Sequence, residues 1–245
     1  DMTKKTVSIL AGQPRHVGST DGTSEAARFW DPKNGVVAFN HLYIAQMNKI
    51  RKMNIATGEI TAFFEEGADD IAFDGTDLYI MQNVTLSRLS LSGNRVFLAG
   101  GSVGYADGAG ATAKFEGQGG ITVDDEYVYV ADWYNHVVRR VNKQNGMVET
   151  LCGVQYKEQK HFYQDGQCAA AYFDAPGDIV KVGKKLYVTE IWGKRIRSID
   201  LETMTVSTFV KALPIDVRAI TTDGSRLYVA TLLTHPAIYS VQLSN

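Results

Sequence analysis

The stretch GGITVDDEYVYVADWYNHVVRRVNKQNGMVETLCG, residues 119–153, decides how this chain folds. It contains four short segments rich in β-branched, aromatic or alternating apolar residues, and Asp, Asn and Gly separate them: 120–123, 127–131, 137–141 and 147–151. Segments of this length and period predict antiparallel strands joined by tight turns. Four such strands within about 45–50 residues are typical of one blade of a β-propeller.

The same pattern recurs along the chain. A Leu/Val-Tyr-Ile/Val step marks the second strand of each copy, at residues 42–44, 78–80, 128–130, 186–188 and 227–229. A short apolar strand precedes each step. A third strand follows it and carries, at what we take as the matching place, Arg51, Arg88, Arg139, Arg197 or Tyr239. Five spaced copies of one pattern predict a repeat architecture.

We therefore expect an all-β, five-bladed β-propeller of four-stranded antiparallel blades, in a single domain over residues 1–245. The blades are expected at roughly 35–64, 69–100, 119–153, 177–210 and 217–243. The last copy has only three strands, and residues 6–12 match the fourth strand of the others. The N-terminal strand is thus expected to complete the C-terminal blade, which leaves no blade edge unpaired. The alternative, a ring that has lost a sixth blade, would leave both ends ragged.

Three of the links between blades share the pattern D-G-x4-A-x-F, at residues 21–29, 107–115 and 165–173. Each follows a Leu-Ala-Gly or Leu-Cys-Gly step. Asp-Gly predicts a turn, Ala permits close approach of two segments, and Phe is expected to fill the wedge between adjacent blades.

Together these motifs, with Tyr-Val-Ala-Asp132 and the following Asn135 and His136, resemble the NHL-repeat β-propeller family. The resemblance covers nearly the whole chain, but the second and fifth copies keep only the strands. The family more often has six blades, so its known sites do not transfer simply to five. The general layout is also similar to the ectodomains of kinetoplastid insect-stage surface antigens. That similarity implies a surface antigen or receptor ectodomain, anchored in a membrane by a segment absent from this chain.

Polar side chains leave the second strand of each blade, where the turns and the long interblade links are expected to share one face: Gln46, Gln82, Asp132, Glu190 and Thr231. One interpretation is a polar ring that contacts a ligand. The interpretation we favour is that Asp132 and Glu190 satisfy backbone groups of their own turns, as Asp side chains commonly do.

Exposed aromatic residues are the better candidates for binding. The link at 154–164 carries several of them among charged residues, and aromatic side chains on such loops are typical of recognition surfaces. Packing onto the neighbouring blade is the alternative for these side chains. The predicted contact residues are Trp133, Tyr156, His161, Phe162, Tyr163 and Trp192.

A metal-dependent enzyme is the main alternative function. Zinc lyases that resemble this family hold the metal with several His side chains, and catalytic zinc needs three protein ligands. The histidines of this chain fall at unrelated places in the repeat: His16, His41, His136, His161 and His235. We therefore predict no catalytic residues, no metal site and no cofactor. A secreted metal-dependent lyase or hydrolase, with its site on the propeller axis, remains the alternative.

Charge argues against a nucleic-acid partner. The chain has 25 basic and 27 acidic residues, a net charge of −2 and no basic run. A protein that binds a polyanion usually shows a dominant basic surface. No apolar run reaches the about 20 residues that a membrane-spanning helix needs.

We call the three links that carry the D-G-x4-A-x-F motif the decorated links. Two cysteines, Cys152 and Cys168, bracket the longest of them. A pair around one loop predicts a disulfide and an oxidising compartment, and two buried thiols are the alternative. Asn83-Val84-Thr85 is an N-glycosylation sequon, which suggests a glycoprotein. The sequence thus predicts a monomeric, non-enzymatic binding or adhesion module, extracellular or at the cell surface, with a protein or carbohydrate ligand.

Overall fold

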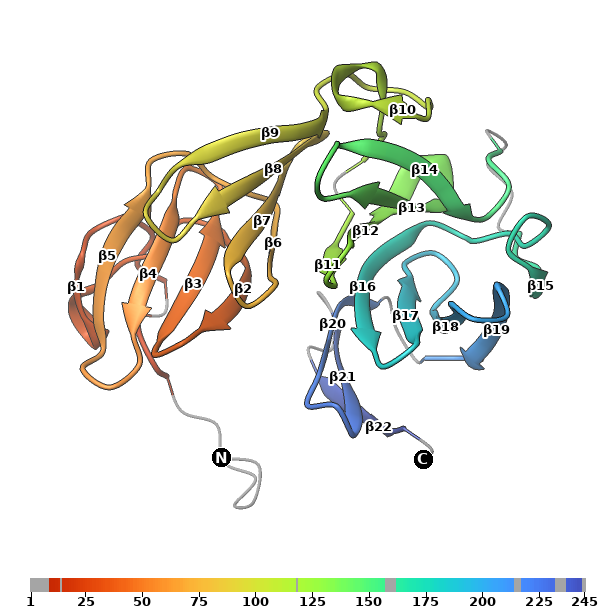
Figure 1. Ribbon diagram of the computed structural model, residues 1–245. Helices are drawn as coiled ribbons and strands as arrows, with labels where there is room; N and C mark the ends of the chain where they lie inside the picture. Colours follow the sequence, from red (N-terminus) through yellow and green to blue (C-terminus); the bar gives the residue numbers. More distant parts are fainter. Residues whose placement is uncertain are drawn as a thin grey trace.

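The computed structural model describes residues 9–13, 15–117, 119–156, 162–213, 217–231 and 237–243. Five antiparallel sheets follow one another in chain order around a common axis (Figure 1). The protein is an all-β, five-bladed β-propeller, as the repeat predicts. No helix among these residues is long and apolar enough to cross a membrane.

Each of the first two blades is built on a meander of four strands. The meander runs from an inner strand at the axis to an outer strand. The first contains β2 (Pro32–Ala38), β3 (His41–Gln46), β4 (Ile50–Asn54) and β5 (Glu59–Phe64). The second contains β6 (Asp70–Phe73), β7 (Asp77–Gln82), β8 (Thr85–Ser90) and β9 (Arg95–Gly100).

The third and fourth blades repeat this meander. The third contains β11 (Ile121–Val123), β12 (Tyr127–Asp132), β13 (Val137–Asn142) and β14 (Met147–Cys152). The fourth contains β16 (Pro176–Val182), β17 (Lys185–Glu190), β18 (Arg195–Asp200) and β19 (Thr205–Val210). The strand boundaries lie close to those that the sequence predicts.

The fifth blade has three strands among the described residues: β20 (Val217–Thr222), β21 (Arg226–Thr231) and β22 (Ile238–Gln242). Residues 6–8 of the expected closing strand lie outside the described part of the chain, and residues 9–12 form no strand. Completion of this blade by the N-terminal segment therefore stays a prediction.

The three decorated links also form short strands. Each sends a two-residue strand to the outer edge of the blade that it enters: β1 (Gly22–Thr23), β10 (Gly108–Ala109) and β15 (Gly166–Gln167). In the first two, a short 3-10 helix follows, η1 (Ser24–Ala26) and η2 (Gly110–Thr112). The glycines of the Asp-Gly pairs have φ of 147°, 137° and 140°, which side chains disfavour. The motif therefore adds a fifth strand to these sheets.

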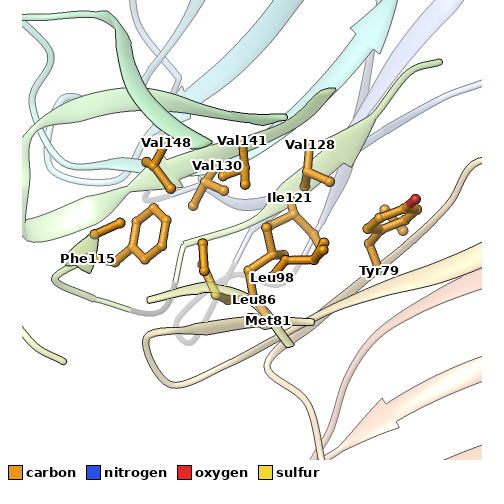
Figure 2. Packing of buried hydrophobic residues seen from close by; sticks show 13 residues of the cluster. Tyr79, Met81, Leu86, Leu98, Phe115, Ile121, Val128, Val130, Val141 and Val148 are labelled. Carbon is orange, nitrogen blue, oxygen red and sulfur yellow. The ribbon is translucent and has the colours of Figure 1, made fainter. Parts of the chain in front are cut away.

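The core lies between blades. One buried cluster packs side chains of β7 to β9 against those of β11 to β14 (Figure 2). Phe115, the last residue of a decorated link, is fully buried in this cluster, and Phe173 has the same place between the third and fourth blades. The predicted role of the motif Phe as an interblade wedge is confirmed at these two links.

A fully buried arginine in the third strand holds each decorated link in place. Arg139 donates to the carbonyls of Lys114 (3.1 Å) and Ala106 (2.8 Å), and its guanidinium lies 5.3 Å from the centroid of the Phe115 ring. It also pairs with Asp107 of the Asp-Gly turn at 2.5 Å. Arg51 pairs with Asp21 at 2.8 Å, and Arg197 with Asp165 at 2.7 Å. The arginine and the link motif therefore form one unit.

The predicted match of Arg88 to these arginines is wrong. Arg51 lies opposite Ile44 in the sheet, and the corresponding Ile80 lies opposite Ser87. The side chain of Arg88 therefore points to the other face of the sheet. The second blade has no Asp-Gly link. Here Arg95 of the outer strand donates to the hydroxyl of Ser87 (3.1 Å) and pairs with Glu66 of the preceding link.

The predicted disulfide is present. Cys152 and Cys168 are bonded, with their Cα atoms 4.2 Å apart, and both are buried. Cys152 ends the outer strand of the third blade, and Cys168 directly follows the two-residue strand on the edge of the fourth. The bond therefore joins two neighbouring blades.

Replacing Arg139 with Ala is expected to lower the free energy of unfolding by about 3–5 kcal/mol, because the variant leaves Asp132 buried without its cation. Arg140→Ala is the matched control. The ion pair of Arg140 with Glu149 is partly exposed, and such pairs contribute about 0–1 kcal/mol. Urea unfolding of the two variants measures the difference, and equal losses would contradict the role given to Arg139.

Candidate functional site

One residue in or directly before each inner strand occupies the same place on the propeller axis. The residue after it pairs, in every blade, with the last residue of the Leu/Val-Tyr-Ile/Val step. These five residues line one cavity of about 460 Å³, the axial cavity. They are Asn34, Asp70, Gly120, Asp178 and Ala219.

Asp70 connects three blades at the axis. Its carboxylate accepts hydrogen bonds from the backbone amides of Ile71 (2.9 Å) and Ile121 (2.5 Å). It also accepts one from the side-chain amide of Asn34. One carboxylate thus holds the inner strands of the first, second and third blades together.

Asp178 does the same for the next pair of blades. It accepts from the amides of Ile179 and Ile220, both at 2.8 Å. Between these two carboxylates, the amide of Gly120 donates to the carbonyl of Gly177 at 2.7 Å. A Cβ on Gly120 would lie 2.0 Å from Oδ1 of Asp178, so only glycine leaves room for that carboxylate.

Burial raises the pKa of both axial carboxyl groups. The pKa of Asp178 rises from 3.8 to about 6, with loss of hydration as the main cause. The pKa of Asp70 rises well above its ordinary value, first because the group is buried and second because of the negative charge of Asp178. In the described chain, neither forms an ion pair with a cation.

Other charged side chains surround the axial cavity. Lys33 pairs with Asp69 at 2.8 Å, and Asp31 lies beside them on the lining. The guanidinium of Arg218, which is exposed, lies 5.3 Å from the centroid of the Trp133 ring. Trp133 thus forms an aromatic wall of the cavity.

Asp132 and Glu190, which end their second strands, bind backbone groups of the preceding links. Asp132 accepts from the amide of Glu116 (2.8 Å), and Glu190 from that of Asp174 (3.0 Å). The expectation that these carboxylates satisfy backbone groups of their own turns is therefore wrong, because the link passes closer to each carboxylate than the backbone of its turn does. Both carboxylates also pair with the buried arginine of the third strand, at 2.8 and 2.7 Å. Burial raises the pKa of Asp132 to about 6.

Sequence reasoning missed the axial carboxylates. It placed the polar ring at the ends of the second strands, and of that set only Thr231 lines the axial cavity. A signal was present, because Asp-Ile begins the inner-strand pairing in two blades, at 70–71 and 178–179.

Aromatic rings from the third and fourth blades form a continuous series of contacts, the aromatic belt. Trp133 and Tyr134, both in the short helix η3 (Trp133–Asn135), are stacked with centroids 4.9 Å apart. Tyr134 lies 6.4 Å from Trp192, and Trp192 lies 5.7 Å from His136. The belt continues through three more rings: His136 on Tyr156 (4.1 Å), Tyr156 beside Tyr172 (5.9 Å) and Tyr172 beside Phe162 (4.8 Å).

The structure brings most of the predicted contact residues together in this belt. Trp133, Tyr156, Phe162 and Trp192 belong to it, and Tyr163 lies next to it with the guanidinium of Arg195 3.5 Å from its ring centroid. His161 lies outside the described residues. Tyr134, Trp192 and Phe162 are exposed, whereas His136, which connects them, is buried. Whether these residues bind a ligand stays a prediction.

Two further predictions concern sites outside the belt. Asn83 is exposed in the two-residue turn between β7 and β8, and its glycosylation stays a prediction. In the described part of the chain, no three His, Cys, Asp or Glu side chains lie close enough to hold a metal ion.

Sequence comparison supports the resemblance to NHL-repeat propellers. NHL repeat-containing protein 2 of Bos taurus is 32% identical over 110 residues, which is 43% of this chain. The chain spans 15% of the length of that relative. No protein-family model matches.

Solved structures show the same fold at low identity. The luciferin-regenerating enzyme gives a TM-score of 0.63 at 12% identity, over 88% of this chain and 79% of its own. A chain of a nidogen/laminin complex gives a TM-score of 0.61 at 14% identity, over 83% of this chain and 72% of that chain. Virginiamycin B lyase of Staphylococcus aureus, solved with quinupristin, gives a TM-score of 0.56 at 15% identity, over 81% of this chain and 62% of the lyase chain. None of these proteins supports the resemblance to kinetoplastid surface antigens.

The raised pKa of Asp178 predicts that the free energy of unfolding falls as the pH rises from about 5 to about 7.5. The folded protein holds this proton more tightly than the unfolded chain, so protonation stabilises the fold and ionisation removes that contribution. Asp132 acts in the same direction. Over this range, the free energy of unfolding of the Asp178→Asn variant should fall by about 1–2 kcal/mol less than that of the parent, as measured by urea unfolding. Identical pH profiles would contradict the assignment.

Proposed function

We propose that this protein is a binding module that holds a protein partner against the aromatic belt. The observation that carries the proposal is the contiguity of the belt. Rings from η3, from the link at 154–164, from Tyr172 and from the turn after β17 meet on one surface, although the sequence separates them by up to 59 positions, from Trp133 to Trp192.

The chemistry of the belt is that of a protein-binding surface. Trp, Tyr and Arg dominate the residues that contribute most to protein association, because large rigid rings bury much area and lose little conformational entropy. The hydroxyl of Tyr156 lies 2.9 Å from the carbonyl of Phe173 and 3.2 Å from that of Phe162, and donating its one hydrogen between them fixes the ring. Arg195 is fixed by its pair with Glu190 at 2.9 Å. Such ordering before binding lowers the entropy that association must overcome.

Comparison adds modest support. A chain of similar fold occurs in the nidogen/laminin complex, so this architecture is found in a protein–protein complex. The likeness to virginiamycin B lyase and to the luciferin-regenerating enzyme, at 15% and 12% identity, reflects the shared fold. We therefore do not extend their activities to this chain.

The disulfide supports an extracellular or cell-surface location for the module. Disulfides persist mainly in oxidising compartments, and this one joins two blades beside the proposed binding surface. The link at 154–164 begins two residues after Cys152 and ends four residues before Cys168. The bond therefore restrains the segment that supplies Tyr156 and Phe162 to the belt.

Protein isolated from its native source under alkylating conditions is expected to carry Cys152 and Cys168 as a disulfide. Intact mass before and after reduction measures this, and reduction should add two hydrogens. Alkylation of both thiols without prior reduction would instead place the protein in a reducing compartment and remove the support for an extracellular module.

Replacing Trp192 or Tyr134 with Ala is expected to weaken partner binding by about tenfold or more, since interface aromatics of this kind contribute about 2 kcal/mol or more. The measurement is recovery of partner proteins from the surface or medium of the source cells, quantified for parent and variants. Circular dichroism and urea unfolding check that each variant is folded.

Trp30→Ala is the matched control for this experiment. Trp30 is 48% exposed, lies on the link that enters the first blade and is not one of the rings of the belt. A partner specific to the belt is kept by Trp30→Ala and lost by Trp192→Ala. Equal recovery by all three variants, with cross-links on another face, would overturn the proposal.

A further inference from the structure

We propose that the axial cavity is a binding site for a primary ammonium group, carried either by a small free amine or by a lysine side chain of a protein. This site is separate from the aromatic belt, although Trp133 contributes to both. The inference goes beyond the proposed function, and neither proposal needs the other to be true.

The first step is the uncompensated charge at the axis. Asp70 is 3% exposed and Asp178 is 7% exposed, and both line the cavity. Buried carboxylates are normally paired with a cation, because an isolated charge away from water is unfavourable. Among the described residues, neither of these two has a cationic partner. A cation from outside the protein would supply the missing partner.

The second step is that charge at this place is not common to the five blades. The corresponding residues of the other three blades are Asn34, Gly120 and Ala219, all uncharged. Asn34 accepts from the following amide, that of Gly35, at 2.7 Å, as Asp70 and Asp178 do from theirs. An amide side chain can therefore make the local turn bond. Asp70 and Asp178 use their second oxygen to accept an amide of a neighbouring blade, and they also bring a negative charge to the cavity.

The third step is the hydrogen-bonding capacity that remains. An ionised carboxylate has about four acceptor positions, and an ammonium group has three donors and no acceptor. Asp178 receives two hydrogen bonds from the protein, so acceptor positions remain on its oxygens. The cavity, at about 460 Å³, has the size of common small-ligand sites, which span about 300–1,000 Å³.

The fourth step is the charge of the whole lining. Its ionisable groups are four carboxylates and two cations: Asp31, Asp69, Asp70, Asp178, Lys33 and Arg218. The cavity is therefore negative when its carboxylates are ionised. Lys33 is already neutralised by Asp69, and Arg218 is exposed at Trp133, where it opposes a bound cation from the rim. Four carboxylates against two cations favour a cationic ligand over an anionic one.

The test is isothermal titration of the full chain at about pH 7.5 with three probes. The probes n-butylammonium and Nα-acetyl-lysine-N-methylamide represent the two sources, and n-butanol has the same alkyl chain without the charge. We expect at least one amine to bind at least about tenfold more tightly than n-butanol. Tighter binding of the lysine derivative assigns the site to a protein side chain, and tighter binding of n-butylammonium assigns it to a free amine.

Variants locate the binding at the axis. Asp178→Asn is expected to weaken amine binding about tenfold or more, and Asp70→Asn provides a second such variant. Glu202→Gln is the matched control, because it removes one carboxylate from an exposed turn outside the cavity. Arg218→Ala should tighten binding, since it removes the opposing charge at an exposed position where folding is not at risk.

The pH dependence provides an independent readout. Amine affinity should rise as the pH increases through about 6, where Asp178 ionises while the amine stays charged. The raised pKa of Asp70 acts in the same direction. The other charged groups of the lining are Asp31, Asp69, Lys33 and Arg218.

Two results would overturn the proposal. One is an amine affinity weaker than about 1 mM and no better than that of n-butanol at about pH 7.5. The other is amine binding that Asp178→Asn, Asp70→Asn and Arg218→Ala all leave unchanged. Trp192→Ala, which tests the aromatic belt, should leave amine binding intact. Failure of one proposal is therefore distinguishable from failure of the other.

Discussion

The ion pair between a buried third-strand arginine and the Asp-Gly turn of the incoming link is the interaction on which the rest of this propeller depends. Arg51, Arg139 and Arg197 are fully buried, yet each meets a carboxylate, two carbonyls and an aromatic face. A guanidinium suits this place, because its planar fork satisfies several acceptors at once. The link can then carry its Phe into the wedge between blades. Hydrophobic packing between sheets therefore follows from a polar contact.

A second set of polar contacts holds the blades at the axis. Asp70 and Asp178 accept amides from the next blade, and the backbone bond from Gly120 to Gly177 joins the third and fourth blades. The arginine units act between link and sheet, whereas the axial carboxylates act between inner strands. The axial carboxylates have no cationic partner in the described chain, so their negative charge is not compensated. The same side chains that join the blades thus give the axis its affinity for a cation.

The fold could be predicted from sequence because the repeat is visible in short stretches of the chain. The Leu/Val-Tyr-Ile/Val steps and the turn residues between strands depend on local geometry, which the sequence shows directly. The disulfide also followed from position, since its cysteines flank one link. The error at Arg88 arose from a register difference of one residue, which changes the face of the sheet on which a side chain lies. The axial site escaped sequence reasoning because its members come from different blades. No local pattern shows that Asp70 and Asp178 approach each other across the axis.

The two candidate sites lie where the blades depart from their common pattern. After the second strand, the third blade has Trp133 where the first has Met47 and the second has Asn83. On the axis, Gly120 leaves space for the Asp178 carboxylate. Residues shared by several blades, such as the buried arginines and the Phe wedges, are accounted for by packing. Trp133 occurs in one blade only and has no such account, whereas Asp70 and Asp178 join neighbouring blades and also bring negative charge to the axial cavity. A repeat protein thus separates its scaffold from its chemistry, and the differences between blades are the places at which to search for a ligand.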